Sequence, residues 1–329
     1  MTVNGLLEFE RTILWNKQRG SVAPLDALLG IVQERYSAGV REMASRLSLN
    51  EAFIPAAETL ARTAQLLISH SALRELVERE GMRAEQSLRT GQYGPNWASK
   101  DCTGQTVITG ADGVMVPLVT DEQKKKRRST EMVQQERQGR KSTRNRGRPK
   151  SGSDGPYKEF KIVSFYDPDK SHKYAVGTSG NHQVLGYRMR REAIKIQISR
   201  AKVKYSVTDG AEWIAKQYNS QLPMLDENIL DYYYLRDHVI ATSHMLYGEG
   251  SRQAHAWRED IMGYVWNQGS LVMLDRLGNY LRRHHSGPKG KSLKSLRDYI
   301  SKRVAMTDYP TFRELGYDCG SGPTESFCG

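Results

Sequence analysis

The 329-residue sequence lacks any apolar run near the roughly 20 residues that a membrane-spanning helix requires. Its first residues, MTVNGLLEFERTI, also lack the basic stretch followed by an apolar stretch that marks a secretory signal. Cysteine is scarce: Cys102, Cys319 and Cys328 are scattered without C-x-x-C spacing, so nothing indicates a disulfide framework or a zinc knuckle. These absences predict a cytoplasmic protein with no membrane partner. The length predicts two domains.

Several catalytic signatures are also missing. No H-E-x-x-H or H-x-H spacing joins the eight histidines, and neither G-x-S-x-G nor a P-loop occurs. The net charge of +12 is unevenly spread, because residues 124–150 carry 12 Lys/Arg and only two Asp/Glu. Localised positive charge steers a protein to nucleic acid and gives salt-dependent affinity through counterion release. The sequence therefore predicts a phosphate-rich partner.

This basic stretch lies in a predicted loop, residues 121–157, with almost no apolar content. Residues 146–150, RGRPK, are similar to the core of an AT-hook, whose arginines enter the narrow minor groove of A·T-rich DNA. Arginine is common throughout the loop, so general phosphate binding is favoured over minor-groove recognition, and a solvated charge run is least favoured. The candidate DNA-binding residues of the loop are Lys124, Lys125, Lys126, Arg127, Arg128, Arg144, Arg146, Arg148 and Lys150.

Residues 1–98 have apolar residues at helical spacing and predict an all-α region. Ser48 to Glu51 has the pattern of a capping box for a following helix, and a second helix is expected over 72–80, ending at Gly81. Helix, turn and helix over about 48–81 is the layout of a DNA-binding unit whose second helix enters the major groove. An ordinary helical hairpin is an equally favoured alternative. The candidate contacts are Arg74, Arg79 and Arg83.

Residues 99–329 predict an α/β domain with a mixed sheet. Strands are expected at residues 106–118, 161–166, 173–176, 205–208 and 228–230. Helices are expected at 192–202 and 211–219, and a helical insertion at 232–312. The expected core positions of the insertion are Trp257, Trp266, Leu274, Leu277 and Leu281.

Two Asp-Gly pairs follow β-branched runs. At Asp112 the pattern favours a type I′ hairpin turn, because apolar residues continue on both sides. Asp209 is followed by helical sequence, which predicts a position at the carboxyl end of a strand, where open α/β sheets hold ligand and metal sites. Glu325, in GSGPTES, is by itself consistent with a capped helix start. Together, three carboxylates from different elements are what two-metal phosphoryl transfer requires.

On these residues the sequence resembles the Kra-type bacterial insertion-sequence transposases, which belong to the DDE group and have an RNase H-like catalytic core. The resemblance rests on residues 110–116, 208–214, 230–231, 309–313 and 320–326, and extends more loosely into residues 23–26 and 35–37. It implies an RNase H-like mixed sheet with a helical insertion, preceded by an all-α region. It also implies a catalytic triad of Asp112, Asp209 and Glu325 that binds two Mg²⁺ or Mn²⁺ ions.

The implied function is a DNA transposase that cleaves the ends of an insertion sequence, joins them to target DNA, forms a homo-oligomer on double-stranded DNA and associates with the nucleoid. Two departures from the family stand out. Tyr232, Tyr233 and Tyr234 occupy the region where the family usually has a histidine, and the chain stops at Gly329, short of the helix that follows the family's glutamate.

The second departure predicts that Glu325 is poorly held and that activity is impaired by C-terminal truncation. The alternative function is therefore an inactive DNA-binding remnant that competes with a full-length transposase. A cellular RNase H-like nuclease is less favoured, because such an enzyme has less need of a helical N-terminal region.

Overall fold

The computed structural model describes residues 10, 12–18, 20–28, 36–116, 129 and 158–328. The chain divides into two compact units, Met1–Gly94 and Pro95–Gly329. None of the helices that the structure describes combines the length and apolarity that a membrane crossing requires.

The first unit packs three helices around a small apolar core: α2 (Ala38–Ser48), α3 (Phe53–Ala64) and α4 (His70–Thr90). The hairpin of β1 (Leu14–Asn16) and β2 (Gly20–Val22), followed by α1 (Pro24–Leu28), precedes them along the chain. The core side chains come from all three helices and include Val40, Ala44, Ala56, Leu60, Leu73 and Leu76. The expected all-α region is thus helical where it packs, with a short hairpin before it.

Two expectations for the helices of this unit are wrong. Ser48 is the last residue of α2, and α3 begins at Phe53, so no capping box forms; Glu51 instead accepts a hydrogen bond from the Thr59 hydroxyl at 3.1 Å. The second helix does not end at Gly81 but continues to Thr90 and stops at Gly91, which has a φ of 77°. One glycine weakens a helix by only about 1 kcal/mol, which the good helix formers on both sides outweigh.

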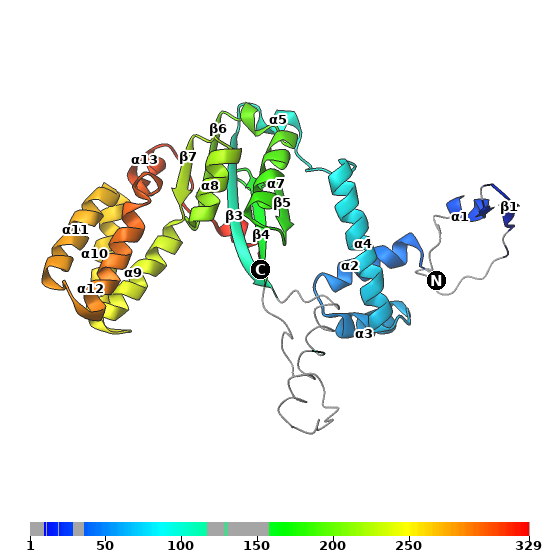
Figure 1. The fold of residues 1–329 in the computed structure, drawn as a ribbon, viewed down its shortest axis with the longest axis horizontal. Helices are drawn as coiled ribbons and strands as arrows, with labels where there is room; N and C mark the ends of the chain where they lie inside the picture. The colour runs from blue at the N-terminus through cyan, green and yellow to red at the C-terminus, as the bar shows by residue number, and fades with distance from the viewer. Residues whose placement is uncertain are drawn as a thin grey trace, which may run out of the picture. The chain divides into compact units, whose positions relative to one another are not determined.

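The second unit is built on a five-stranded mixed sheet (Figure 1). Its strands are β3 (Thr106–Val116), β4 (Lys158–Tyr166), β5 (Lys173–Thr178), β6 (Val203–Thr208) and β7 (Glu227–Leu230). The order across the sheet is β5-β4-β3-β6-β7, in which β3, β4 and β5 are antiparallel and β6 and β7 run parallel to β3. The predicted strands and the mixed α/β class are confirmed.

Helices α7 (His182–Lys195) and α8 (Glu212–Gln221) cover one face of the sheet (Figure 1). Leu185 and Met189 of α7 share a buried cluster with Val163 of β4. The prediction of a helix over 192–202 is wrong: α7 begins ten residues earlier, where Asn181 Oδ1 accepts a hydrogen bond from the Val184 amide at 3.0 Å. A run of basic residues hides its apolar face in the sequence. The short α5 (Ser99–Cys102) and η1 (Ile198–Arg200) complete this side.

The helical insertion follows β7 and stands beside that edge of the sheet (Figure 1). Its helices are α9 (Tyr232–Tyr247), α10 (Arg252–Gln268), α11 (Ser270–Arg283), α12 (Gly287–Ser301), η2 (Val304–Thr307) and α13 (Tyr309–Glu314), and α14 (Gly322–Glu325) comes after it. Of the expected core residues, Trp257 and Leu277 are buried, while Trp266, Leu274 and Leu281 are partly buried against the same cluster.

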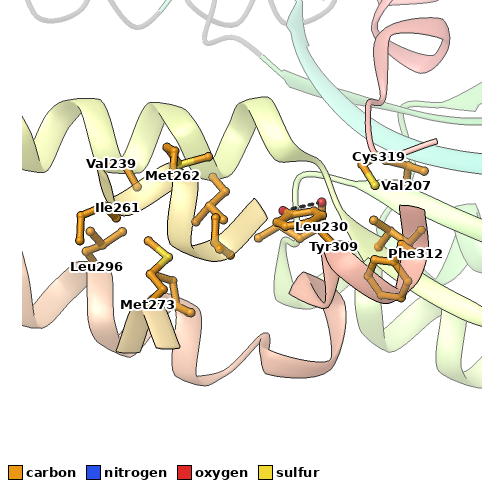
Figure 2. Close-up of a cluster of buried hydrophobic side chains, with 14 of the residues drawn as sticks. Val207, Leu230, Val239, Ile261, Met262, Met273, Leu296, Tyr309, Phe312 and Cys319 are labelled. Carbon is orange, nitrogen blue, oxygen red and sulfur yellow. Dashed lines mark hydrogen bonds between the residues drawn. The ribbon is translucent and has the colours of Figure 1, made fainter. Parts of the chain in front are cut away.

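One apolar cluster joins the insertion to the sheet (Figure 2). Ile261 and Met273 come from the insertion, and Val207 and Leu230 come from the last two strands. The buried Tyr309 hydroxyl donates a hydrogen bond to the Leu230 carbonyl at 2.9 Å. Because insertion and sheet share this core, the insertion is part of the domain that carries the candidate site.

Candidate active site

Asp112 lies inside β3, opposite Ile162 of β4. The interpretation of Asp112-Gly113 as a hairpin turn is therefore wrong. Pairing with β4 continues beyond it as far as Val116 opposite Lys158, because the β-branched residues after Gly113 extend the strand. The half-buried Asp112 side chain accepts a hydrogen bond from the Gly113 amide at 2.6 Å.

Asp112 and Asp209 are brought together by the parallel pairing of β3 and β6. Ile108 pairs with Tyr205 and Thr109 with Ser206, and the two aspartates lie three residues beyond this last pair. This register brings the positions of Asp112 and Asp209 near each other, since β6 ends at Thr208, directly before Asp209. Side chains alternate along a strand, so Asp112 points to the same face as Ile108, and Asp209 is the first residue after β6.

The charge balance of Asp209 agrees with this proximity. Burial raises the pKa of Asp209, and the negative charges of Asp112 and Asp231 add to the increase, while the Ala211 amide and the Arg303 guanidinium oppose it. A carboxylate whose pKa is raised by another carboxylate lies close to it. A nearby cation would relieve this repulsion.

The turn that carries Asp209 is held by the helical insertion. Asp209 Oδ1 accepts a hydrogen bond from the Ala211 amide at 2.8 Å, and the Tyr299 hydroxyl donates to the Asp209 carbonyl at 3.0 Å. Arg303 Nε donates to the Gly210 carbonyl at 2.9 Å. Gly210 has a φ of 74°, and a Cβ there would lie 2.8 Å from Arg303 Nε. Only glycine allows this approach, so the turn fits the insertion closely.

Glu325 reaches the same face of the sheet through α14, which packs on β3 at Gly110. A Cβ on Gly110 would overlap the Thr324 hydroxyl and lie 2.9 Å from Thr324 Cβ. The buried Thr324 hydroxyl is hydrogen-bonded to the Ser164 hydroxyl of β4 at 2.8 Å. Since Gly110 lies two residues from Asp112 on the same face of β3, α14 brings Glu325 to the face of the sheet that carries Asp112.

Asp231 anchors the segment that precedes Glu325. Its Oδ1 caps α9 by accepting hydrogen bonds from the Tyr233 amide at 2.6 Å and the Tyr234 amide at 3.0 Å, while its Oδ2 accepts one from the Ser321 amide. The Ser321 hydroxyl then donates to Glu325 Oε1 at 3.1 Å. The expectation that Glu325 is poorly held is therefore wrong for its backbone, although its side chain is exposed.

Tyr234 lies within electrostatic reach of all three carboxylates. Burial raises the pKa of Tyr234 to about 12, and the charges of Asp112, Glu325 and Asp209 add to the increase. Burial likewise raises the pKa of the Cys328 thiol to about 12, with Asp112 and Glu325 contributing. Among the described residues, however, no three His, Cys, Asp or Glu side chains already stand at the spacing of metal ligands.

The candidate DNA contacts of the first unit lie on α4. Arg74 pairs with Glu78 at 3.1 Å, and Arg83 pairs with Glu80 at 2.6 Å; Arg79 is exposed. Because α4 carries four arginines and four glutamates, the helix itself has no excess of positive charge. The basic-loop candidates, from Lys124 to Lys150, lie outside the described residues.

Tyr299 and Arg303 are site residues that the sequence did not reveal. They hold the Asp209 turn from about 90 positions further along the chain, and no motif marks them. Ser164 and Thr324 were equally hidden, because their contact depends on the position of α14 over Gly110. In the sequence, this contact was marked only by Gly110, because a glycine inside a strand permits the close approach of another segment.

Residues 1–150 match the model of an uncharacterised protein family, UPF0236. The matched range contains Asp112 but neither Asp209 nor Glu325. A comparison with curated proteins finds no match. The description of this family assigns no activity.

Proposed function

We propose that this chain is a DNA transposase of the DDE group, which cleaves and joins strands of double-stranded DNA with Asp112, Asp209 and Glu325. The main support is the convergence of these carboxylates on one face of the sheet, two through the register of β3 and β6 and the third through α14 on Gly110. The strand order also agrees with the RNase H-like fold that the sequence resemblance implies, since an antiparallel three-stranded part is continued by two parallel strands. The Kra-type likeness supplies the reaction class.

The donor set fits Mg²⁺ or Mn²⁺, because both ions prefer oxygen ligands and carboxylates supply them. Asp112, Asp209 and Glu325 would hold two such ions. When bound, the ions supply activation of the attacking oxygen and stabilisation of the leaving oxygen. Tyr299 and Arg303 fix the backbone that presents Asp209, and Ser321 orients Glu325.

A DNA-binding protein without cleavage activity is the alternative, and one observation favours it. Glu325 is exposed and engaged with Ser321, and no three acidic, His or Cys side chains within the described residues stand at metal-ligand spacing. Both functions require affinity for DNA. They differ in metal-dependent nicking.

The test is nicking of supercoiled plasmid by the full chain in Mg²⁺, in Mn²⁺ and in EDTA. We expect nicking only with a divalent metal, and we expect Asp209→Asn to abolish it while leaving duplex binding intact, because the substitution removes a charged ligand but keeps the shape. Asp275→Asn is the matched control, since Asp275 is exposed on α11 and outside the site.

Nicking by Asp209→Asn at the wild-type rate would exclude Asp209 as a metal ligand. Duplex binding without nicking under any metal condition would favour the non-catalytic alternative. Absence of both binding and nicking in the wild type would reject the transposase function.

A further inference from the structure

A basic groove lies on the helical insertion, outside the three carboxylates. It has a volume of about 490 Å³ and is lined by Glu212, Lys291, Lys294, Ser295, Asp298, Tyr299, Lys302 and Arg303. All of these residues except Glu212 come from α12 and the turn after it. One wall of the groove is therefore a single helix face.

The spacing of the lining residues shows how α12 is used. Lys291, Lys294 and Asp298 recur every three or four residues, while Leu293, Leu296 and Ile300 on the other side of the helix are buried in the core. Residues 287–303 contain six Lys/Arg and one acid. The apolar face of α12 thus fixes the helix, and its polar face is left with an excess of positive charge.

Lys291 and Lys294 lie at the end of the groove away from Asp209. Both are exposed, and neither has an acidic partner among the described residues. Lys302 differs, since its Nζ lies 3.2 Å from Glu212 Oε1 in an exposed pair. Lysines without partners are suited to contacting phosphate. From Lys291 to Lys302 the stripe covers about 16 Å of helix, which is the rise of about five base pairs of duplex.

The near end of the groove is the turn that carries Asp209. Tyr299 and Arg303 line the groove and also bond to the backbone carbonyls of Asp209 and Gly210. The Arg303 guanidinium lies 3.9 Å from the centre of the Tyr299 ring, which holds the two side chains together. A DNA strand lying in the groove would therefore pass the turn that carries Asp209.

We infer, on the basis of the proposed DNA-cleaving function, that this groove binds the phosphate backbone of the DNA whose scissile phosphate reaches Asp209. Lys291 and Lys294 contact successive phosphates away from the cleavage point. The residues that line the groove lie outside the basic stretch 121–157, and two of them contact the turn that carries Asp209. The groove orients the substrate in addition to attracting it.

The test compares two variants of the full chain with the same change in charge. Lys291→Gln/Lys294→Gln removes the groove lysines, and Lys289→Gln/Arg297→Gln removes two exposed basic residues of α12 that do not line the groove. Binding of a fluorescent DNA duplex of mixed sequence is measured across a salt series, and plasmid nicking is measured in Mn²⁺.

Each lost phosphate contact lowers the slope of log affinity against log salt by about 0.9, so the groove variant should lose up to about 1.8. Its affinity at 0.1 M salt should fall by about tenfold and its nicking rate should fall with it. The control variant should stay near the wild type in both measurements.

Equal slopes in the two variants would overturn the groove inference while leaving the proposed function standing, provided that the wild type still nicks in a manner that depends on Asp209. A wild type that binds and shows the groove effect without nicking would reject the cleavage function and retain the groove. Tighter binding of an RNA duplex of the same sequence, lost in the groove variant, would reject DNA as its ligand.

Discussion

Replacing Gly110 with alanine tests the position of α14, on which the location of Glu325 depends. A glycine inside a strand ordinarily makes the folded protein less stable than an alanine would, by about 0.5–1 kcal/mol. Gly110→Ala should therefore stabilise the protein if nothing packs on this residue. In the structure, the new Cβ overlaps the Thr324 hydroxyl and lies 2.9 Å from Thr324 Cβ. The sign of the change in the free energy of unfolding therefore shows whether α14 packs on Gly110.

The expected decrease in the free energy of unfolding of Gly110→Ala follows from two contacts. Forcing an extra methyl group into a packed contact destabilises by about 1–3 kcal/mol. Moving α14 aside also breaks the Thr324–Ser164 hydrogen bond, which contributes about 0.5–1.5 kcal/mol. After subtraction of the strand-propensity gain, the free energy of unfolding should fall by about 1–3 kcal/mol. In a Thr324→Ala background the loss should be smaller, because the overlapping hydroxyl is gone.

Urea unfolding measures the free energy of unfolding, with the slope checked for constancy. Gly263→Ala in α10 is the control, because a Cβ there has open space, and it should stabilise by up to about 1 kcal/mol. Nicking should be reduced in Gly110→Ala even where the protein remains folded. A neutral or stabilising effect of Gly110→Ala would show that α14 does not pack on β3, and would remove the structural basis for placing Glu325 in the site.

Two further predictions concern charge. Burial alone would raise the pKa of Glu192, but hydrogen bonds from Tyr174, Lys195 and Arg191 outweigh it and hold the pKa below its ordinary value of 4.5. The carboxylate therefore stabilises the fold above about pH 4.5 and loses this effect as the pH falls through the folded-state pKa. Glu192→Gln should lower the free energy of unfolding by about 1.5–3 kcal/mol at neutral pH, and its difference from the wild type should become smaller in acid. A difference that stays constant with pH in urea unfolding would refute this. Neutralising residues 124–128 should flatten the salt dependence of duplex affinity in the same assay, and an unchanged slope would exclude the loop from the interface.

Much of the sheet could be predicted from local patterns. The β-branched runs of β3 and β6 and the turn between β4 and β5 were recognisable, and Asp209 was correctly placed after a strand and before a helix. These features depend on neighbours in the sequence, which propensity and periodicity describe well. Asp112 and Glu325 taken alone had plain structural interpretations, as a turn and as a capped helix start, and only the resemblance joined them with Asp209 in one triad.

The predictions from sequence are wrong where contacts between residues far apart in the chain decide the local structure. Asp112-Gly113 reads as a turn, but pairing with a strand that begins some 45 residues later keeps β3 extended through it. Ser48 to Glu51 reads as a cap, but packing of α2 against the other helices extends that helix to Ser48. The contacts of Tyr299 and Arg303 with the Asp209 turn span about 90 residues and leave no local pattern.

The tie between Asp231 and Ser321 spans 90 residues, as does that between Tyr299 and Asp209, and both enclose most of the helical insertion. Contacts of such long sequence separation form late in folding, because the intervening chain must be ordered before its ends can meet. The two aspartates of the sheet can align as soon as β3 and β6 pair, whereas the glutamate can join them only after the insertion has folded. Under the proposed function, the three carboxylates would therefore be complete only once the whole domain is assembled, and cleavage would depend on that last step of folding.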